Sequence, residues 1–426
     1  MLGRRGPTLF LVHVTSLRLD HDLDLVALGA RSGMLWRRDG LVMAGMGVAE
    51  RIPIDRAAGQ AGATEAQERL AALSSTDRIA LPGSGPVAFA AMPFEPTAAA
   101  ELVVPRALFV RGREGRRWAT LVNDRGPADD ATVATAVDQA VALAASAPVG
   151  AQPVELELRS VLAPESWRDQ VVGRARDRIR AGELSKAVLA RELRLRADAP
   201  LDHAAIIERL AAVHPTAIVF ALEGFVGASP ELLVSRTDDV VRAHPLAGTA
   251  ARASDPAIDQ QQVAGLLASE KDRWEHQITI DWLLDELLPF CSYVDAEPKP
   301  SIVSLPNVHH LGTQVDGRLS APSASVLELV AALHPTPAVG GDPQDAALQL
   351  IGELESAERG RYAGPTGWVD SRGNGAFCVA IRSAQLQQSE ATLFAGVGVV
   401  ADSDPEAELA ETRAKFQAML AVLLRP

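Results

Sequence analysis

Over the first 127 residues, short apolar stretches alternate with turn-forming residues. Three of these stretches have the length and boundaries of β-strands, namely residues 25–29, 40–43 and 117–122. Residues 129–145 instead carry valines and alanines at helical spacing, which predicts a helix. The turn-forming residues at 146–153 then predict a linker. We therefore expect an N-terminal α+β portion, residues 1–150, of unassigned role and packed into the same fold as a catalytic region, residues 151–426.

After the linker, the hydrophobic periodicity becomes clearer. A helix over 164–181 carries its large apolar side chains on one face, and Gly182 is placed to end it. Further helices are predicted after the caps Asp202 and Asp342, and over residues 256–290 and 405–424. Strands are predicted at residues 186–190, 218–222, 231–236, 240–244, 362–370, 376–384 and 393–400. Because hairpin-like strands dominate, the expected fold class is α+β, with large antiparallel sheets packed with flanking helices.

Composition narrows the classes of function. The net charge of −13 argues against nucleic-acid binding, which needs clustered Lys and Arg. No stretch offers the ~18 consecutive apolar residues of a membrane span. The apolar run from Leu9 to Val12 is interrupted by His13, so we expect a strand there and not a signal peptide. Cys291 and Cys378 lack metal-ligand spacing, which favours reduced thiols in a cytoplasmic protein.

Two predicted helices carry carboxylates in patterns that suggest a metal site. In the last helix, Glu408, Glu411 and Lys415 share one face, and near residue 275 the sequence places Asp272 beside Glu275. Each pattern alone is more often a solvated surface ladder. If Glu275 and Glu411 converge, however, they form the oxygen-rich site that a hard cation such as Mg²⁺ prefers.

Three other stretches contain residues that local structure does not require. Residues 244–249 end a predicted strand with a Gly-Thr pair suited to binding a ligand. Residues 334–341 combine rigid prolines with flexible glycines, as the wall of a pocket does. Arg382 stands in an otherwise apolar strand, where a buried guanidinium requires an anionic partner. A turn, a loop and a structural salt bridge are the respective alternatives.

Taken in order, these segments resemble the chorismate-utilising enzyme family, which includes isochorismate, salicylate, anthranilate and aminodeoxychorismate synthases. The resemblance covers residues of about 160 to 423. Its motifs lie at residues 186–191, 227–233, 245–249, 269–276, 308–313, 333–338, 359–365, 379–384 and 395–415.

The resemblance implies a role for each matching residue. Lys186 would be the general base that activates water, and Glu231 the general acid that protonates the departing hydroxyl. Glu275 and Glu411 resemble the Mg²⁺ ligands, with Asp272 and Glu408 as outer positions. Asp272 stands where some relatives have Glu. The remaining positions would bind the substrate: Gly248, Thr249, His310, Ala338, Tyr362, Arg382, Gly396, Gly398 and Lys415.

Two positions choose among the family's branches. Aminodeoxychorismate synthases carry a nucleophilic Lys where this chain has Ala247, so water is the expected nucleophile here. Ala338 stands where anthranilate and salicylate synthases usually have Thr. The sequence of residues 334–338 resembles the one found in isochorismate synthases. The resemblance therefore implies a monomeric, Mg²⁺-dependent isochorismate synthase, of the menaquinone or siderophore type, that acts on chorismate without an obligate protein partner.

Three alternatives remain open at this point. A salicylate synthase would form isochorismate and then eliminate pyruvate in the same pocket. An anthranilate synthase subunit would need a glutamine-amidotransferase partner. A chorismate sensor without activity would belong to another class, although the presence of Lys186, Glu231, Glu275 and Glu411 together argues against it.

Overall fold

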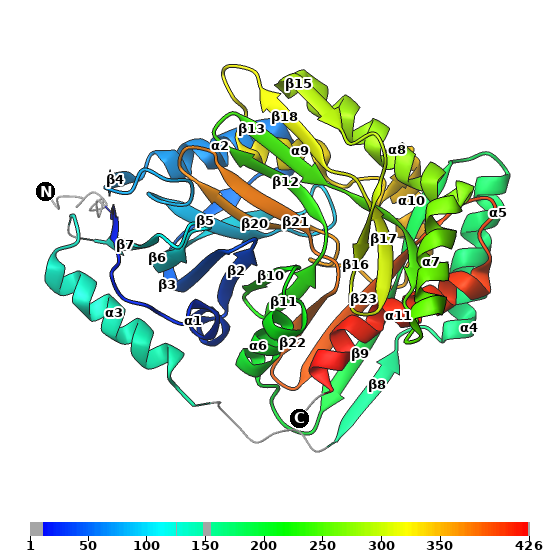
Figure 1. The fold of residues 1–426 in the computed structure, drawn as a ribbon, viewed down its shortest axis with the longest axis horizontal. Helices are drawn as coiled ribbons and strands as arrows, with labels where there is room; N and C mark the ends of the chain where they lie inside the picture. The colour runs from blue at the N-terminus through cyan, green and yellow to red at the C-terminus, as the bar shows by residue number, and fades with distance from the viewer. Residues whose placement is uncertain (1–11, 125, 148–154, 425–426) are drawn as a thin grey trace, which may run out of the picture.

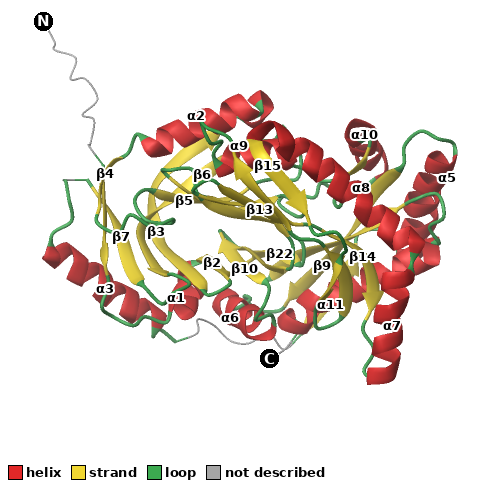
Figure 2. Ribbon diagram, turned by 45° about the horizontal axis from the view of Figure 1, so that its top comes forward, coloured by secondary structure: helices red, strands yellow, loops and turns green. Residues whose placement is uncertain are grey.

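Two layers of strands face each other at the centre of the molecule, and helices cover both outer sides (Figures 1 and 2). The computed structural model describes residues 12–124, 126–147 and 155–424. Within those residues, a 20-stranded sheet and a three-stranded sheet hold all the strand pairings. The central core between the layers consists almost entirely of strand residues and includes Trp36, Phe220 and Trp368.

The elements follow in chain order. The strands are β1 (His13–Arg18), β2 (Met34–Arg38), β3 (Leu41–Ile54), β4 (Ser74–Asp77), β5 (Val87–Ala91), β6 (Ala100–Arg111), β7 (Arg117–Asn123), β8 (Leu156–Ser160), β9 (Lys186–Ala197), β10 (Ile218–Leu222), β11 (Phe225–Ser229), β12 (Leu232–Thr237), β13 (Val240–His244), β14 (Leu246–Ala251), β15 (Cys291–Ala296), β16 (Ser301–Ser304), β17 (Val308–Gly312), β18 (Val315–Leu319), β19 (Gly341–Asp342), β20 (Pro365–Asp370), β21 (Gly375–Val379), β22 (Ser383–Gln387) and β23 (Glu390–Val399). The helices are α1 (Leu25–Ser32), α2 (Gln60–Ala71), α3 (Asp130–Ala144), α4 (Pro164–Ser166), α5 (Arg174–Arg180), α6 (His203–Val213), α7 (Pro256–Ala268), α8 (Glu270–Leu287), α9 (Val326–Leu333), α10 (Gln344–Leu354) and α11 (Pro405–Leu423).

Strands from the two ends of the chain belong to one sheet. Strand β2 pairs with β10, and β5 pairs with β20, both antiparallel. On one outer side, α2, α9 and α10 bury their apolar faces. On the other side, α1, α3, α6 and α11 do the same. The expected α+β class with large antiparallel sheets and flanking helices is confirmed.

Most predicted elements are present. Helix α6 begins after Asp202, whose side chain accepts a hydrogen bond from the Ala205 N–H. The predicted helix at 164–181 is continuous, although its middle (Trp167–Gly173) is a π-helix, and Gly182 follows it with φ +81°. The predicted strand at the apolar run from Leu9 falls mostly outside the described residues, as does most of the predicted linker.

Three local predictions are wrong. Residues 25–29 form the start of α1 and not a strand, because Asp24 caps the helix and Gly33 ends it in the left-handed conformation. Asp342 is not the cap of α10, because it lies in β19 and its carboxylate accepts a hydrogen bond from Ser185. The strand expected at 376–384 is two strands, β21 and β22, which pair with different neighbours.

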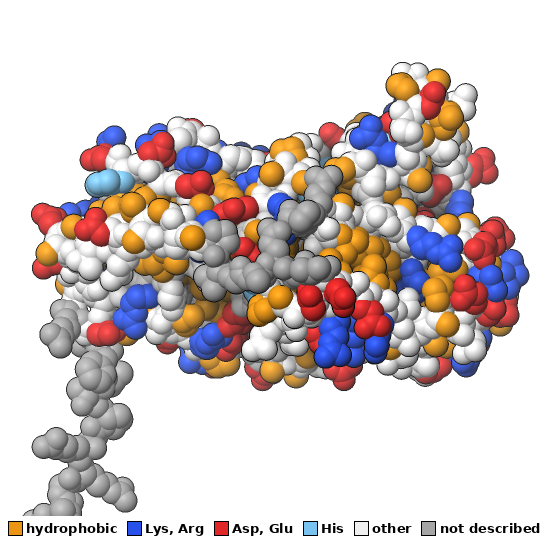
Figure 3. All heavy atoms as spheres, turned by 90° about the horizontal axis from the view of Figure 1, so that it is seen from below, with side chains coloured by type: hydrophobic (Ala, Val, Ile, Leu, Met, Phe, Trp, Pro, Cys, Tyr) orange, Lys and Arg blue, Asp and Glu red, His pale blue; other side chains and the backbone are white. Residues whose placement is uncertain are grey.

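The surface carries both signs of charge. On the face shown in Figure 3, basic and acidic side chains are interspersed over the part of the protein that is described. None of the described helices is long and apolar enough to cross a membrane.

Candidate active site

One cavity of about 80 Å³ gathers side chains from strands and helices of the second half of the chain. Every residue to which the resemblance gave a role, apart from Lys186, lines this cavity: Glu231, Gly248, Thr249, Asp272, Glu275, His310, Ala338, Tyr362, Arg382, Gly396, Gly398, Glu408, Glu411 and Lys415. Residues separated by up to 184 positions, from Glu231 to Lys415, therefore meet at one place. Such convergence is what distinguishes a site from scattered surface charge.

Lys186 reaches the site through an ion pair. It is completely buried at the start of β9, and its Nζ lies 2.8 Å from Glu275 Oε1 on α8. The pair fits only because β23 has a glycine at 398. A Cβ there would lie 2.3 Å from Glu275 Oε1 and 3.1 Å from Lys186 Cε. Gly398 therefore makes room for the two side chains, in addition to any contact of its backbone with a ligand.

Glu231 is buried in a setting that favours its neutral form. Its residue is 3% exposed, between β11 and β12. Burial raises the pKa of Glu231 from 4.5 to about 7, although the Leu246 N–H and the charges of Arg382, Lys186 and Lys415 act in the opposite direction. Near neutral pH this carboxyl group can hold a proton and give it to a bound molecule.

Arg382 is a buried cation that pairs with no carboxylate in the part of the chain that the structure describes. It is 7% exposed, stands between β21 and β22 with φ +54°, and its Nε has no hydrogen-bond partner among the described residues. Its Nη2 lies 3.0 Å from His310 Nε2. Because a guanidinium only donates, His310 must accept at Nε2 and carry its proton on Nδ1, which donates to the Gly248 carbonyl at 3.0 Å. Burial and Arg382 together hold the pKa of His310 well below its usual range, so this ring is neutral.

Tyr362, Gly396 and Lys415 also line the cavity. The Tyr362 ring is buried and stacks on Phe394 with the ring centroids 5.3 Å apart. Lys415 donates to the Gly396 carbonyl at 2.8 Å and pairs with Glu411 at 2.6 Å. Of the three cations that line the cavity, Lys271 and Lys415 pair with glutamates, whereas Arg382 pairs with no carboxylate among the described residues. Arg382 is therefore the group best placed to receive an anionic ligand.

The four predicted metal-site carboxylates come from the first two turns of two helices. Ser269 caps α8 by accepting from the Asp272 N–H, and Asp404 caps α11 by accepting from the Glu406 N–H. These starts place Asp272 and Glu275 on one helix, and Glu408 and Glu411 on the other, at i, i+3. Burial, and then repulsion from Glu275 and Glu411, raises the pKa of Asp272. Burial, and then repulsion from Glu411, raises the pKa of Glu408 to about 7.

Three of the four carboxylates pair with lysine side chains. Glu275 pairs with Lys186, Glu411 with Lys415, and Glu408 with Lys271 at 3.3 Å. No group of three or more His, Cys, Asp or Glu side chains within the described residues is arranged to hold a metal ion. The donor chemistry nevertheless fits a hard divalent cation, since four mutually repelling carboxylates surround one cavity and two of them are pushed toward their neutral form.

Sequence reasoning gave Lys271 no role, yet it lines the cavity. Its i, i+4 spacing to Glu275 is that of a local ion pair on one helix, but the side chain instead reaches Glu408 on α11. A signal was available in the sequence. The chain has four lysines among its 41 basic residues, and three of the four, Lys186, Lys271 and Lys415, are at this site. A lysine kept in so arginine-rich a chain marks a position where a guanidinium does not substitute.

A buried ion pair that sequence reasoning also missed holds two segments of the site together. Arg359 and Glu355, both buried, form a salt bridge. Arg359 donates to the carbonyls of Val188 and Val339 at 2.6 and 2.8 Å, and Glu355 accepts from the Ala190 N–H at 2.7 Å. The pair therefore ties β9, which carries Lys186, to the loop that carries Ala338.

Comparison with known proteins gives a consistent result. The sequence model of the family described as "Chorismate binding enzyme" matches residues 25–424, so the likeness is not confined to residues 160–423. The chain is 39% identical over 356 residues to the putative isochorismate synthase MenF of Mycobacterium tuberculosis, covering 80% of this chain and 87% of that protein.

Two solved structures share the fold over nearly the whole chain. A putative 2,3-dihydroxybenzoate-specific isochorismate synthase, DhbC from Bacillus anthracis, superimposes with a TM-score of 0.75 at 30% identity, covering 95% of this chain and 97% of that one. MenF, the menaquinone-specific isochorismate synthase from Escherichia coli, gives a TM-score of 0.79 at 25% identity, with coverages of 97% and 94%.

Proposed function

This chain belongs to the chorismate-binding enzyme family, and on that premise we propose that it is an isochorismate synthase, an isomerase that converts chorismate to isochorismate. The observation that carries the proposal is the composition of one cavity. A carboxyl group with a pKa raised to about 7 and a guanidinium that pairs with no carboxylate among the described residues meet there, and a buried lysine reaches the cavity through its ion pair with Glu275. These are an acid, a base and an anion receptor, which are the three groups that the reaction requires.

In the proposed reaction, a water molecule attacks C2 of the ring and gives its proton to the Lys186 amine. The ring double bonds shift, the C4–O bond breaks, and Glu231 gives its proton to the departing hydroxyl group, which leaves as water. The atoms balance, because one water is consumed and one is released. Glu231 loses one proton to the departing hydroxyl group, and Lys186 gains one proton from the attacking water. Both catalysts are needed because water is a weak nucleophile and hydroxide is a poor leaving group.

The ion pair with Glu275 positions Lys186 for its proposed role. The Lys186 Nζ lies 2.8 Å from Glu275 Oε1, and the lysine side chain is completely buried. Glu275 therefore holds the amine of the proposed base at the edge of the cavity that it lines.

We propose that Glu275 and Glu411 hold Mg²⁺, with Asp272 and Glu408 as outer positions. When bound, the ion would supply positive charge that binds the ring carboxylate of the substrate and that neutralises the surrounding carboxylates. The fit is supported by the mutual repulsion of the four acidic side chains around the cavity.

Arg382, Tyr362 and Lys415 are the proposed receptors for the enolpyruvyl carboxylate. Arg382 is already oriented by His310, which accepts from one of its nitrogens and leaves the Nε free. His310 is in turn fixed by Gly248 and lies 3.2 Å from the Thr249 hydroxyl. An arginine held in this way can bind a carboxylate with two hydrogen bonds at little cost in side-chain entropy.

All proposed site residues come from the region after residue 151, and we propose that this region is the catalytic part of a single monomeric enzyme. The N-terminal strands complete the sheet that carries it, as the β2–β10 and β5–β20 pairings indicate.

Product analysis tests the proposal. The purified protein is incubated with chorismate and Mg²⁺, and the mixture is separated by chromatography. We expect isochorismate at equilibrium with chorismate, and loss of turnover in Lys186→Ala and Glu231→Gln. Lys299→Ala is the matched control, since Lys299 is exposed and outside the cavity. Salicylate plus pyruvate would instead identify a salicylate synthase, and normal turnover in Lys186→Ala would refute the base assignment.

A further inference from the structure

Among the described residues that line the active-site cavity, Lys271 is the one cation to which the proposed reaction gives no task. Arg382 and Lys415 are proposed receptors for a substrate carboxylate, and Lys186, which reaches the cavity, is the proposed base. Lys271 stands in the first turn of α8, and its side chain is 42% exposed. A side chain so exposed could extend into water, yet its Nζ lies 3.3 Å from Glu408 Oε1 on α11.

The carboxylates of the proposed metal site surround this ammonium group. Burial alone would lower the pKa of Lys271. The charges of Glu408, Glu275 and Asp272 outweigh burial and raise that pKa above its ordinary value, so the side chain is charged throughout the neutral pH range. Lys271 therefore reduces the mutual repulsion of these carboxylates when no ion is bound.

Lys271 is also the least firmly held of the three lysines at the site. Lys186 is completely buried, and Lys415 donates to the Gly396 carbonyl in addition to its ion pair with Glu411. Within the described part of the chain, the one hydrogen bond of Lys271 is to Glu408. It can therefore leave the site at the cost of a single half-exposed contact.

A divalent cation at this site would compete with Lys271. A Mg²⁺ ion held by Glu275 and Glu411 brings two positive charges close to the ammonium group, and like charges repel. With Glu408 as an outer position, the ion also attracts the carboxylate to which Lys271 donates. Both effects oppose binding of the ion, so the lysine raises the dissociation constant for Mg²⁺.

From these contacts we propose that Lys271 is a positioning residue that sets the Mg²⁺ affinity of the site: it holds Glu408 when no ion is bound and gives up that carboxylate when the ion enters. The inference rests on the proposed function, since it takes Glu275 and Glu411 as the Mg²⁺ ligands. Its consequence is a change of unusual sign, because removing a polar side chain from the site should make the site bind Mg²⁺ more tightly.

Isothermal titration calorimetry with magnesium chloride, in the absence of chorismate, measures this affinity without requiring turnover. We expect Lys271→Gln to bind Mg²⁺ roughly tenfold more tightly than the wild type. Lys271→Arg keeps the positive charge and should not tighten binding.

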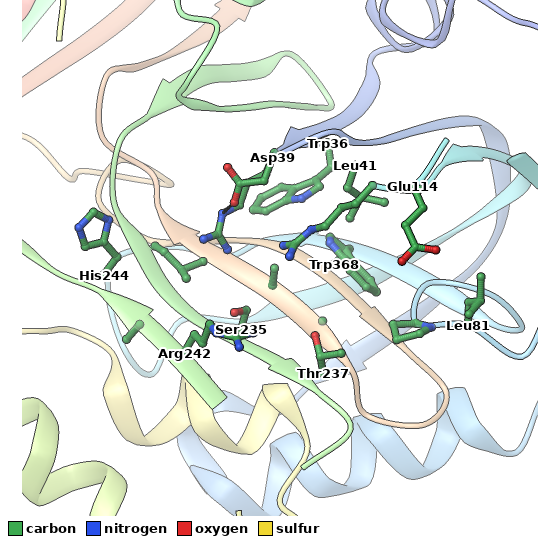
Figure 4. A pocket seen from close by; sticks show the side chains of 18 of the residues that line it. Trp36, Asp39, Leu41, Leu81, Glu114, Ser235, Thr237, Arg242, His244 and Trp368 are labelled. Atoms are coloured by element: carbon green, nitrogen blue, oxygen red, sulfur yellow. Dashed lines mark ion pairs between the residues drawn. The ribbon is translucent and has the colours of Figure 1, made fainter. Parts of the chain in front are cut away.

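Arg242→Gln is the matched control for the change in net charge. Arg242 is also half-exposed and pairs with a carboxylate, Asp316, at 2.7 Å. It lines a separate cavity of about 700 Å³, shown in Figure 4, which shares no lining residue with the active site. Its loss should leave the Mg²⁺ affinity unchanged.

The direction of the change separates this role from a merely structural one. If Lys271 served to order Glu408 for the ion, Lys271→Gln would bind Mg²⁺ more weakly. Weaker or unchanged binding in Lys271→Gln would therefore overturn the inference, as would equal tightening in Arg242→Gln.

Glu411→Ala tests the premise separately. It should weaken Mg²⁺ binding roughly tenfold, both alone and combined with Lys271→Gln. Binding that depends on Glu411 but is unchanged in Lys271→Gln would refute only the role of Lys271. Absence of Glu411-dependent binding in every variant would overturn the metal site and this inference together.

Discussion

Replacing Glu231 by Gln should remove the general acid and at the same time change how the stability of the protein depends on pH. The wild-type carboxyl group is buried, and its pKa is raised from 4.5 to about 7 by burial. Gln has nearly the same shape and can accept the hydrogen bond from the Leu246 N–H, but it carries no charge at any pH. The comparison therefore isolates the cost of ionising this one group inside the protein.

The sign follows from the direction of the shift. Below pH 4.5 the carboxyl group is neutral in both the folded and unfolded states, so no penalty arises. As the pH rises toward 7, the unfolded chain ionises Glu231 while the folded protein resists, and stability falls. Above pH 7 the folded protein carries the full penalty. A pKa that moves from 4.5 to about 7 corresponds to ~3 kcal/mol, most of which develops between pH 5 and pH 8.

Urea unfolding followed by circular dichroism, at pH 5 and at pH 8 without added metal, measures the effect. We expect the stability of Glu231→Gln relative to the wild type to improve by ~2–3 kcal/mol between the two pH values. Any constant cost of burying the amide cancels in this difference. Turnover of chorismate should be lost at both pH values.

Glu275→Gln is the matched control with the opposite expectation. Burial would raise the pKa of Glu275, but the charges of Lys186, Lys271 and Lys415 lower it overall. Its stabilising effect is therefore complete above pH 4.5 and lost only at lower pH. Glu275→Gln should destabilise the protein equally at pH 5 and pH 8, by ~3 kcal/mol, because it leaves Lys186 buried without its partner. If Glu231→Gln also showed the same difference at both pH values, Glu231 would not be held neutral and the reasoning about the acid would fail.

Three further predictions follow from the geometry. Gly398→Ala should displace the Glu275 carboxylate, lower the free energy of unfolding in urea by ~1–3 kcal/mol and reduce turnover. The control Gly352→Ala, where nothing lies within 4 Å of the new Cβ, should be neutral or stabilising. Arg382→Gln should raise the KM for chorismate roughly tenfold or more in steady-state kinetics, and a KM within twofold of wild type would refute its role as anion receptor. Chelation of the metal should abolish turnover, and added Mg²⁺ should restore it. Glu411→Ala should raise the Mg²⁺ concentration for half-maximal activity about tenfold, and an unchanged concentration would show that Glu411 is not a ligand.

The order of elements could largely be read from the chain. Helix α6 depends on the cap at Asp202 and on apolar residues at helical spacing, both of which lie within a few residues of one another. The wrong predictions occurred where such signals are weak. The apolar run at 25–29 is too short to distinguish helix from strand by periodicity, and its caps, Asp24 and Gly33, decide the outcome.

The candidate site was also largely visible in the sequence, because its motifs carry the residue types that the chemistry needs. What could not be predicted is which charged groups pair with one another. Lys271 and Glu275 are four residues apart on one helix, yet Glu275 pairs with Lys186 on β9 and Lys271 with Glu408 on α11. The i, i+4 spacing alone would predict that Lys271 pairs with Glu275. The packing of α8 against β23 and α11 instead brings each of these side chains close to a different partner.

The sequence by itself thus determined the kinds of elements, the family and the chemical identity of the catalytic groups, because these depend on residue types and on neighbours close in the chain. Only the tertiary structure decided the raised pKa of Glu231, the hydrogen-bond partner of Arg382 and the pairing of Lys186 with Glu275. Desolvation and charge–charge interaction depend on what surrounds a group in space. Those surroundings come from strands that are far apart in the chain, such as β9 and β23, and they exist only once the sheet has formed.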